Sequence, residues 1–285
     1  MIPKKLLRNI RVPPGDQIRL EDYATDWDFH PELAKLGKDQ VRDAATRILV
    51  ENQSALAEAQ ELLWASDSWS VLVVLQAMDA AGKDGMIKHV MSGINPQGCQ
   101  VFSFKVPSAE EVDHNFLWRY MRALPERGRI GIFNRSYYED VLVVRVHPEI
   151  LEKQRLPAKK FDRKFWEARY DDINRFERHL VRNGTLVLKF FLHISKEEQR
   201  RRFIARLEDP EKHWKFSLGD LAERQHWDAY QAAYQDALNA TSTKWAPWYV
   251  IHSDLKVTAR ALVSEVMISR INKLKLSFPD VTGEV

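Results

Sequence analysis

The sequence reads Val71-Leu-Val-Val-Leu75 and, after three intervening residues, Asp79-Ala-Ala-Gly-Lys83-Asp-Gly85. Five consecutive apolar residues, three of them β-branched, are typical of a strand that is buried on both faces of a sheet. The turn of small residues that follows leads into a helical stretch at 86–92. A buried strand that runs through a Gly-Lys turn into a helix predicts one unit of a parallel α/β sheet.

The turn itself predicts a phosphate-binding loop. Small residues let backbone N–H groups approach phosphate oxygens, the helix N-terminus adds partial positive charge, and Lys83 adds a full charge. The loop departs from the G-x-x-x-x-G-K-[ST] pattern, because Ala77 replaces the first glycine and Asp84 replaces the hydroxyl residue. In that pattern the hydroxyl contacts Mg²⁺. A carboxylate must take its place here, and Asp79 is the first candidate. The residues expected to bind phosphate here are Ala80, Ala81, Gly82, Lys83, Asp84 and Gly85.

The same alternation continues along the chain. Further strands are expected at 100–104, 129–133, 185–194 and 248–252, and helices at 31–65, 114–124, 161–180, 196–207, 226–240 and 255–275. This order predicts a parallel five-stranded sheet with helices on both faces and right-handed crossovers. Residues 1–65 are expected to form an irregular arm and helices that pack on the core, and residues 66–285 the core itself. A segment at about 208–226, rich in charged and aromatic residues, is expected to form a lid.

Composition limits the class of protein. The chain has 285 residues, 43 basic and 40 acidic side chains and a net charge of +3, which argues against a protein that coats nucleic acid. One cysteine, Cys99, excludes an internal disulfide and a cysteine-based zinc site. No stretch approaches the roughly 18 apolar residues of a membrane span, and the N-terminus lacks the apolar centre of a secretory signal. We expect a cytoplasmic protein that binds neither nucleic acid nor membrane.

Basic residues gather in two places. Arg135 follows the third expected strand, at the edge of the sheet where open α/β folds bind ligands, and its guanidinium can grip a phosphate. The expected lid and the helix before it also carry many arginines and lysines. Of these, Arg206 and Lys215 are the strongest candidates for phosphate binding, whereas Arg200 and Arg201 are expected to lie on the solvated surface.

Four motifs, in this order along the chain, resemble the polyphosphate kinase 2 family. They are the loop at 79–85, Phe133-Asn-Arg-Ser-Tyr-Tyr-Glu-Asp140, Lys212-His-Trp-Lys-Phe-Ser217 and Ala246-Pro-Trp-Tyr-Val-Ile251. The resemblance implies a P-loop kinase-like core with a helical lid, inorganic polyphosphate as phosphoryl donor, and AMP, ADP or ATP as the nucleotide partner. It also implies Mg²⁺ or Mn²⁺ and a homo-oligomer, a dimer or a tetramer. Many members have aspartate at the position of Asn134, and the asparagine form resembles the branch that accepts both AMP and ADP.

Roles for individual residues follow as hypotheses. Asp79 and Asp140 are candidate magnesium ligands, with Glu139 as a further one, because this cation prefers carboxylate oxygens and retains waters. Arg135 and Lys83 would hold the transferring phosphates, and Asn134 would bind the acceptor phosphate or a metal-bound water. Asp140 and Glu139 could instead be ordinary helix-start residues, and Arg135 could form a structural ion pair.

Two other functions fit parts of the sequence. A conventional nucleotide or nucleoside kinase that uses ATP as donor would share the fold, although Asp84 and the 133–140 motif argue against it. A non-catalytic P-loop module that binds phosphate-rich ligands is the alternative from another class. Lys83 and the nearby carboxylates favour an enzyme instead.

Overall fold

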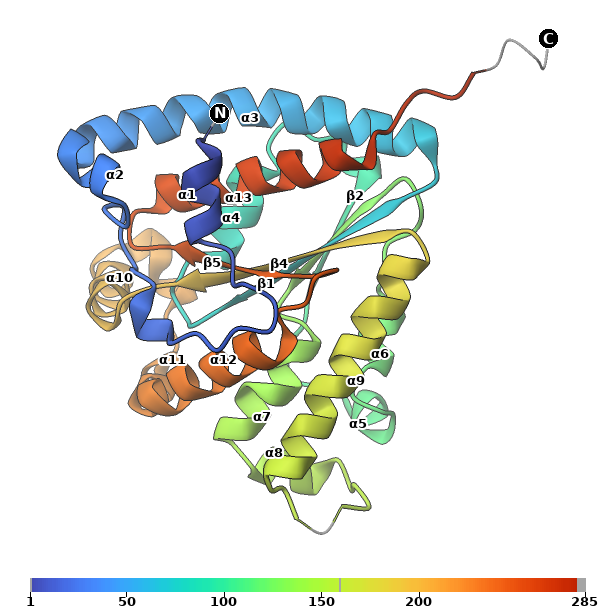
Figure 1. The fold of residues 1–285 in the computed structure, drawn as a ribbon. Coiled ribbons are helices and arrows are strands. Elements are labelled where there is room, and N and C mark those ends of the chain that lie inside the picture. Colours follow the sequence, from blue (N-terminus) through green and yellow to red (C-terminus); the bar gives the residue numbers. More distant parts are fainter. Residues whose placement is uncertain (1, 159, 281–285) are drawn as a thin grey trace.

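The computed structural model describes residues 2–158 and 160–280, and its core is a five-stranded parallel sheet. The strand order is β2-β3-β1-β4-β5, so β1 lies at the centre between β3 and β4 (Figure 1). The strands are β1 (Ser70–Ala77), β2 (Cys99–Ser103), β3 (Ile130–Asn134), β4 (Thr185–His193) and β5 (Trp248–His252). The predicted α/β class and all five predicted strands are confirmed, with ends that agree to within two residues.

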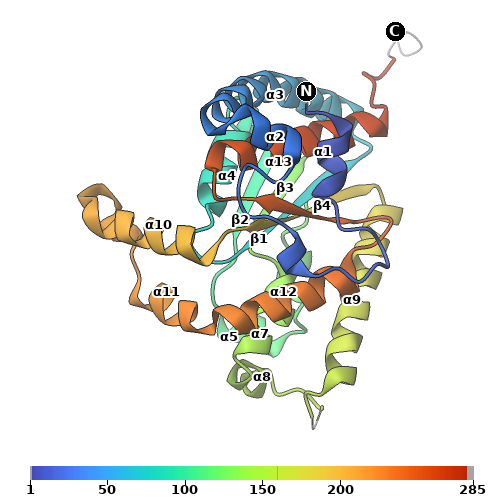
Figure 2. The same cartoon turned by 60° about the vertical axis from the view of Figure 1, so that its left-hand side comes forward.

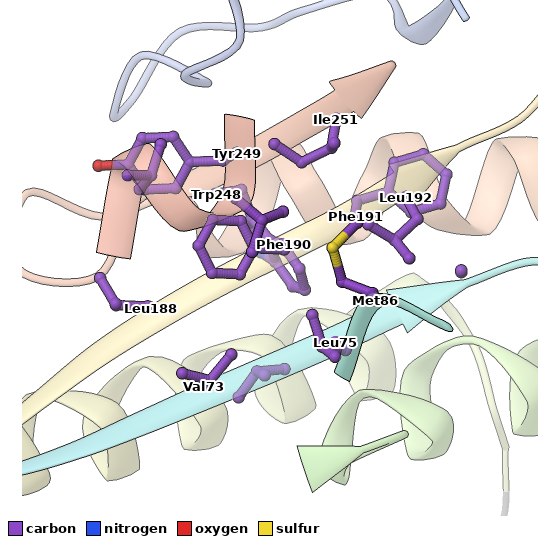
Figure 3. Close-up of a cluster of buried hydrophobic side chains, with 14 of the residues drawn as sticks. Val73, Leu75, Met86, Leu188, Phe190, Phe191, Leu192, Trp248, Tyr249 and Ile251 are labelled. Atoms are coloured by element: carbon purple, nitrogen blue, oxygen red, sulfur yellow. The ribbon is translucent and has the colours of Figure 1, made fainter. Parts of the chain in front are cut away.

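The central strands are buried along their whole length. Every residue of β1 and of β4 is buried, which is why Val71–Leu75 reads as an uninterrupted apolar run. Figure 3 shows part of this core, where side chains of β1, β4 and β5 meet Met86. Since a fully buried aliphatic or aromatic side chain contributes roughly 1.5–3 kcal/mol, this core holds the carboxyl ends of the strands in fixed positions at one edge.

Helices cover both faces of the sheet (Figures 1 and 2). One face carries α1 (Lys4–Asn9), α2 (Pro31–Leu36), α3 (Lys38–Ser66), α4 (Lys83–Val90) and α13 (Lys256–Ile271). The other carries α5 (Ala109–Asp113), α6 (Trp118–Met121), α7 (Val143–Val146), α8 (Glu149–Lys153), α9 (Arg163–Arg182) and α12 (Trp227–Thr241). Helix α3 packs on α13, and α9 packs on α12 and β4. None of the helices within the described ranges has the length and apolar content needed to cross a bilayer.

Two helix predictions are wrong in detail. Of the predicted helix at 114–124, only the short helix α6 is present. A separate helix, α5, precedes it, because Ser108 forms a capping box with Glu111, and the chain leaves the helical conformation at His114. The predicted helix at 31–65 is interrupted at Gly37, whose φ of 82° only glycine adopts freely.

The N-terminal arm is also more ordered than predicted. It contains the helix α1, and it then runs beside the edge strand β5. Val12 N donates to Trp248 O at 2.9 Å, and Val250 N donates to Ile10 O at 2.7 Å. The arm therefore covers part of an otherwise open sheet edge. The proposed division of the chain near residue 65 stays a prediction.

The predicted lid region projects from the sheet beside α10 (Lys196–Glu208), as Figure 2 shows. It consists of the 3₁₀ helix η4 (Pro210–Lys215), α11 (Leu218–Glu223) and the 3₁₀ helix η5 (Arg224–His226). Trp214 and Leu218 are 77% and 76% exposed. None of the residues of these three helices is buried, so little core packing holds the segment, which is the property expected of a lid.

Candidate active site

The phosphate loop lies between β1 and α4, at the carboxyl edge of the sheet. Ala80 and Gly82 adopt left-handed φ angles of 60° and 109°, and α4 begins directly at Lys83. Backbone turns of this kind aim N–H groups at bound anions. Lys83 Nζ donates to Ala77 O at 2.9 Å, so the ammonium folds back over the loop. Burial lowers the pKa of Lys83, while the Asp79 carboxylate opposes the shift.

A basic cavity of about 470 Å³ opens above this loop. It is lined by the loop, by Asn134 and Arg135 after β3, by α10 and the lid, and by the start of α13. Eight basic and only three acidic side chains face it, although the whole chain is nearly balanced in charge. The lid contributes Lys212 and Lys215. This arrangement suits a polyanion that extends past the loop.

All the predicted phosphate-binding residues line this cavity, including Arg206 and Lys215. Arg206 Nη1 donates to Lys215 O at 3.1 Å and to the Asp220 carboxylate at 3.3 Å. Arg200 and Arg201 are exposed, as predicted, and pair with Glu197 and with the partly buried Glu198.

Asn134 and Arg135 meet the loop from the neighbouring strand. Asn134 Nδ2 donates to the Asp84 carboxylate at 2.8 Å. Arg135 has a left-handed φ of 65°, and its guanidinium donates to the Asp79 carboxylate at 3.2 Å. The other terminal nitrogen of Arg135 lies 3.9 Å from the Glu139 carboxylate. A bulky residue at positive φ is uncommon, so the surrounding structure must hold Arg135 in this conformation.

A second cavity, of about 420 Å³, is also lined by Arg135. Tyr230 and Tyr234 of α12 line it. Apolar side chains from three separate segments also line it, namely Val106, Val143 and Ile150.

The two cavities share the side chains of Asp79, Arg135 and Asp220. Burial raises the pKa of Asp220, and the nearby Asp79 carboxylate adds to this shift. A group held in one cavity can therefore meet a group held in the other at this junction.

Glu139 and Asp140 lie in the 3₁₀ helix η3 (Tyr137–Val141) but have different surroundings. Glu139 lines the second cavity, and burial raises its pKa while Arg135 opposes the shift. Asp140 lines neither cavity. Its carboxylate accepts from Gln154 Nε2 at 3.0 Å and lies 3.6 Å from Arg169, and burial raises its pKa to about 6. These contacts join η3 to α9 and to Gln154 at the end of α8. The assignment of Asp140 as a metal ligand stays a prediction.

The carboxylates present fit a magnesium ion that is bound partly by substrate. Among the residues that the structure describes, no three His, Cys, Asp or Glu side chains gather closely enough to hold a metal by themselves. Mg²⁺ commonly uses one or two carboxylates, several waters and substrate phosphates. Asp79, which is half-buried and faces both cavities, offers such a carboxylate.

Sequence reasoning missed several residues of the site. Lys256 and Arg260 line the basic cavity. The sequence could have indicated them, because two basic residues one helical turn apart follow the fifth strand, at the edge of the sheet where ligands bind. Arg202 lies one turn before Arg206, but it is buried and donates to the carbonyls of the phosphate loop. Gln199 and Asp220 gave no signal in the sequence.

Comparisons with known proteins find relatives that match nearly the whole chain. The family model for polyphosphate kinase 2 (PPK2) matches residues 39–279. The ADP-polyphosphate phosphotransferase of Rhodopseudomonas palustris is 51% identical over 276 residues, which cover 96% of this chain and 93% of the relative. The AMP/ADP-polyphosphate phosphotransferase of Meiothermus ruber is 47% identical over 273 residues, 96% of each chain.

A solved structure extends the match to three dimensions. The crystal structure of polyphosphate kinase 2 from Arthrobacter aurescens has a TM-score of 0.79 and 39% identity, and the match covers 95% of this chain and 94% of that one. The family model covers most of the chain, and the relatives match it nearly end to end. This chain belongs to the polyphosphate kinase 2 family.

Proposed function

We propose that this protein transfers a phosphoryl group between inorganic polyphosphate and AMP or ADP, forming ADP or ATP. One observation carries the proposal: a basic cavity and a partly apolar cavity meet at Asp79, Arg135 and Asp220. Phosphoryl transfer requires a donor and an acceptor to be aligned at such a junction, with their charge neutralised. The names of the relatives support the same substrates.

The basic cavity is the proposed donor site. Polyphosphate carries about one negative charge per unit, and clustered lysines and arginines bind such a chain as they bind nucleic acid backbones. The loop N–H groups and Lys83 would hold the phosphate that is transferred. Lys215 from the lid and Arg260 from α13 would hold units further along the chain.

The second cavity is the proposed acceptor site. Tyr230, Tyr234 and Ile150 offer aromatic and apolar surface for a nucleoside. The guanidinium of Arg135, at the junction, can bind a phosphate with two parallel hydrogen bonds. Bound in this way, the acceptor phosphate would face the donor phosphate beside Asp79.

Asp79 is the proposed ligand of Mg²⁺ or Mn²⁺, with Glu139 and Asp140 as further candidates. The metal would neutralise charge on the transferring phosphates. The chain itself aligns the two substrates and neutralises charge through Lys83 and Arg135. Because one phosphoanhydride replaces another, substrate concentrations would set the direction of the reaction.

Asn134 supports the finer proposal that both AMP and ADP are accepted. Its motif resembles the branch that accepts both nucleotides, and the relative from Meiothermus ruber is named for both. In the structure its neutral amide lines the basic cavity and donates to the Asp84 carboxylate. We also propose that the protein is cytoplasmic. We further propose that it forms a homodimer or homotetramer, and light scattering on the purified protein would test this oligomeric state.

The experiment is ATP formation by purified protein with Mg²⁺, long-chain polyphosphate and ADP, with AMP in a parallel reaction. We expect ATP from ADP, and ADP followed by ATP from AMP, and no product when polyphosphate is omitted. Activity only with ATP plus a monophosphate would support a conventional nucleotide kinase instead. Polyphosphate binding without any transfer would support a non-catalytic phosphate-binding module.

A further inference from the structure

Two buried side chains of α10 hold the backbone of the phosphate loop. Gln199 Nε2 donates to Asp79 O at 2.9 Å. Arg202 Nη1 donates to Ala80 O at 3.0 Å and to Ala81 O at 2.8 Å. Three successive loop carbonyls thus accept hydrogen bonds from one helix, which follows a different strand of the sheet.

These bonds also set the direction of the loop N–H groups. In a planar trans peptide the C=O and the following N–H point in opposite directions. Fixing the carbonyls of Asp79 and Ala81 toward α10 therefore turns the N–H groups of Ala80 and Gly82 away from it. Both residues line the proposed donor cavity. The side chains of α10 thereby pre-arrange the donors that would meet a phosphate.

Gln199 also contacts the lid. Its Oε1 accepts from Arg224 Nη1 at 2.9 Å, and the same nitrogen donates to Lys196 O at 2.7 Å. Arg224 is the first residue of η5, which joins α11 of the lid to α12 (Figure 2 labels both helices). The Gln199 side chain is 1% exposed, so both halves of its amide depend on these protein partners. One buried amide therefore joins the end of the lid to the phosphate loop.

We propose that Gln199 is a positioning residue that couples the lid to the phosphate loop. An amide buried to this extent is unfavourable with either half unpaired. A movement of Arg224 with the lid therefore displaces Gln199, and the carbonyl of Asp79 follows. The placement of the lid would then determine how well the loop N–H groups face the donor. The effect on turnover rests on the function proposed above, whereas the coupling of the backbone does not.

The test combines hydrogen–deuterium exchange of the loop amides with steady-state kinetics on five variants, the fifth being Arg224→Lys. Gln199→Met removes both hydrogen bonds at similar side-chain volume. Arg224→Met removes the hydrogen bonds of Arg224 to Gln199 and to Lys196 O but leaves the bond from Gln199 to Asp79. The double variant tests whether the effect of Arg224 on the loop depends on Gln199. Arg200→Met is the matched control, because this arginine is on the same helix but forms only an exposed pair with Glu197.

We expect faster exchange of amides 80–85 in Gln199→Met and, to a smaller degree, in Arg224→Met. In Gln199→Met, kcat/KM for polyphosphate should fall by up to about 10²-fold, the order that a small misplacement of reacting groups costs. The double variant should be no worse than Gln199→Met, because Arg224 acts through Gln199. Arg224→Lys, which keeps a donor, should restore part of the protection, and Arg200→Met should match the wild type.

Wild-type loop exchange in Arg224→Met would overturn the coupling, and so would additive losses in the double variant. If Gln199→Met does not fold, the comparison of Arg224→Met with Arg224→Lys still tests the coupling, because both variants keep the hydrogen bond from Gln199 to Asp79. Exchange is measured without substrate. A coupled loop in a protein that transfers no phosphoryl group would therefore refute the proposed function and leave this inference standing.

Discussion

Arg135→Met is the substitution that most directly tests the junction between the two cavities. The guanidinium lies 3.2 Å from the Asp79 carboxylate and 3.9 Å from the Glu139 carboxylate, and its side chain is 41% exposed. Methionine keeps similar length and removes the charge. The substrate phosphates then lose their cationic partner, and the carboxylates of Asp79 and Glu139 remain beside them without a neutralising charge.

The size of the effect follows from the charge. Two unit charges about 4 Å apart interact by about 4 kcal/mol near a protein surface. At about 1.4 kcal/mol per factor of ten, kcat/KM should fall by about 10³-fold. This is the lower end of the roughly 10³–10⁵-fold effect of an arginine that acts on a transferring phosphoryl group. Stability should change by less than about 1 kcal/mol, because partly exposed ion pairs contribute little.

The assay is steady-state ATP formation from ADP and polyphosphate, with thermal melting measured in parallel. Arg135→Lys, which keeps the charge but loses the two-pronged geometry, should fall between the wild type and Arg135→Met. Arg200→Met should behave as the wild type. A folded Arg135→Met protein with kcat/KM within tenfold of the wild type would refute the role given to Arg135.

Three further predictions concern the loop and the sheet edge. Lys83→Met should lower transfer on the order of 10³-fold without lowering the melting temperature by more than about 4 °C; unchanged turnover would reject the phosphate-loop assignment. Asp79→Asn should raise the Mg²⁺ concentration for half-maximal rate by at least about tenfold, since even outer-shell substitutions cost about 10–100-fold; an unaltered Mg²⁺ titration would rule out this ligand. Burial lowers the pKa of His193 and of His252 from 6.5 to about 4. Their contribution to stability is therefore complete above pH 6.5 and is lost as the pH falls toward 4, because the unfolded state then binds more protons. Melting temperatures of His193→Gln/His252→Gln should depend less on pH in this window than those of the wild type, and equal slopes would contradict the assignment.

The sequence predicts the sheet well because its central strands are buried on both faces. An apolar run such as Val71–Leu75 fits a buried strand far better than a helix when a small-residue turn follows it so closely. The helices near residue 115 are harder to predict, because the capping box at Ser108 competes with a weak helical pattern. The order within the N-terminal arm depends on pairing with β5, more than 200 residues away, and no local pattern carries that information.

The same reasoning explains which site residues were predicted. Asp79, Lys83 and Arg135 follow neighbouring strands, and the carboxyl ends of parallel strands meet at one edge of the sheet. Gln199 and Asp220 belong to the site only through contacts made across the fold. Neither residue type in a helix indicates a function by itself. Adjacent residues can also differ, as Glu139 and Asp140 do, because the short helix η3 turns their side chains to different neighbours.

We propose that phosphoryl groups pass directly from polyphosphate to a nucleotide at the junction of the two cavities. The most direct test follows the atoms: purified protein, Mg²⁺ and ADP are mixed with ³²P-labelled long-chain polyphosphate, and the nucleotides are separated. We predict label in the terminal phosphate of ATP with the wild type, and its loss in Lys83→Met. Unlabelled nucleotides in the wild-type reaction would show that polyphosphate is not the phosphoryl donor, and equal labelling by the two proteins would show that Lys83 does not act in the transfer.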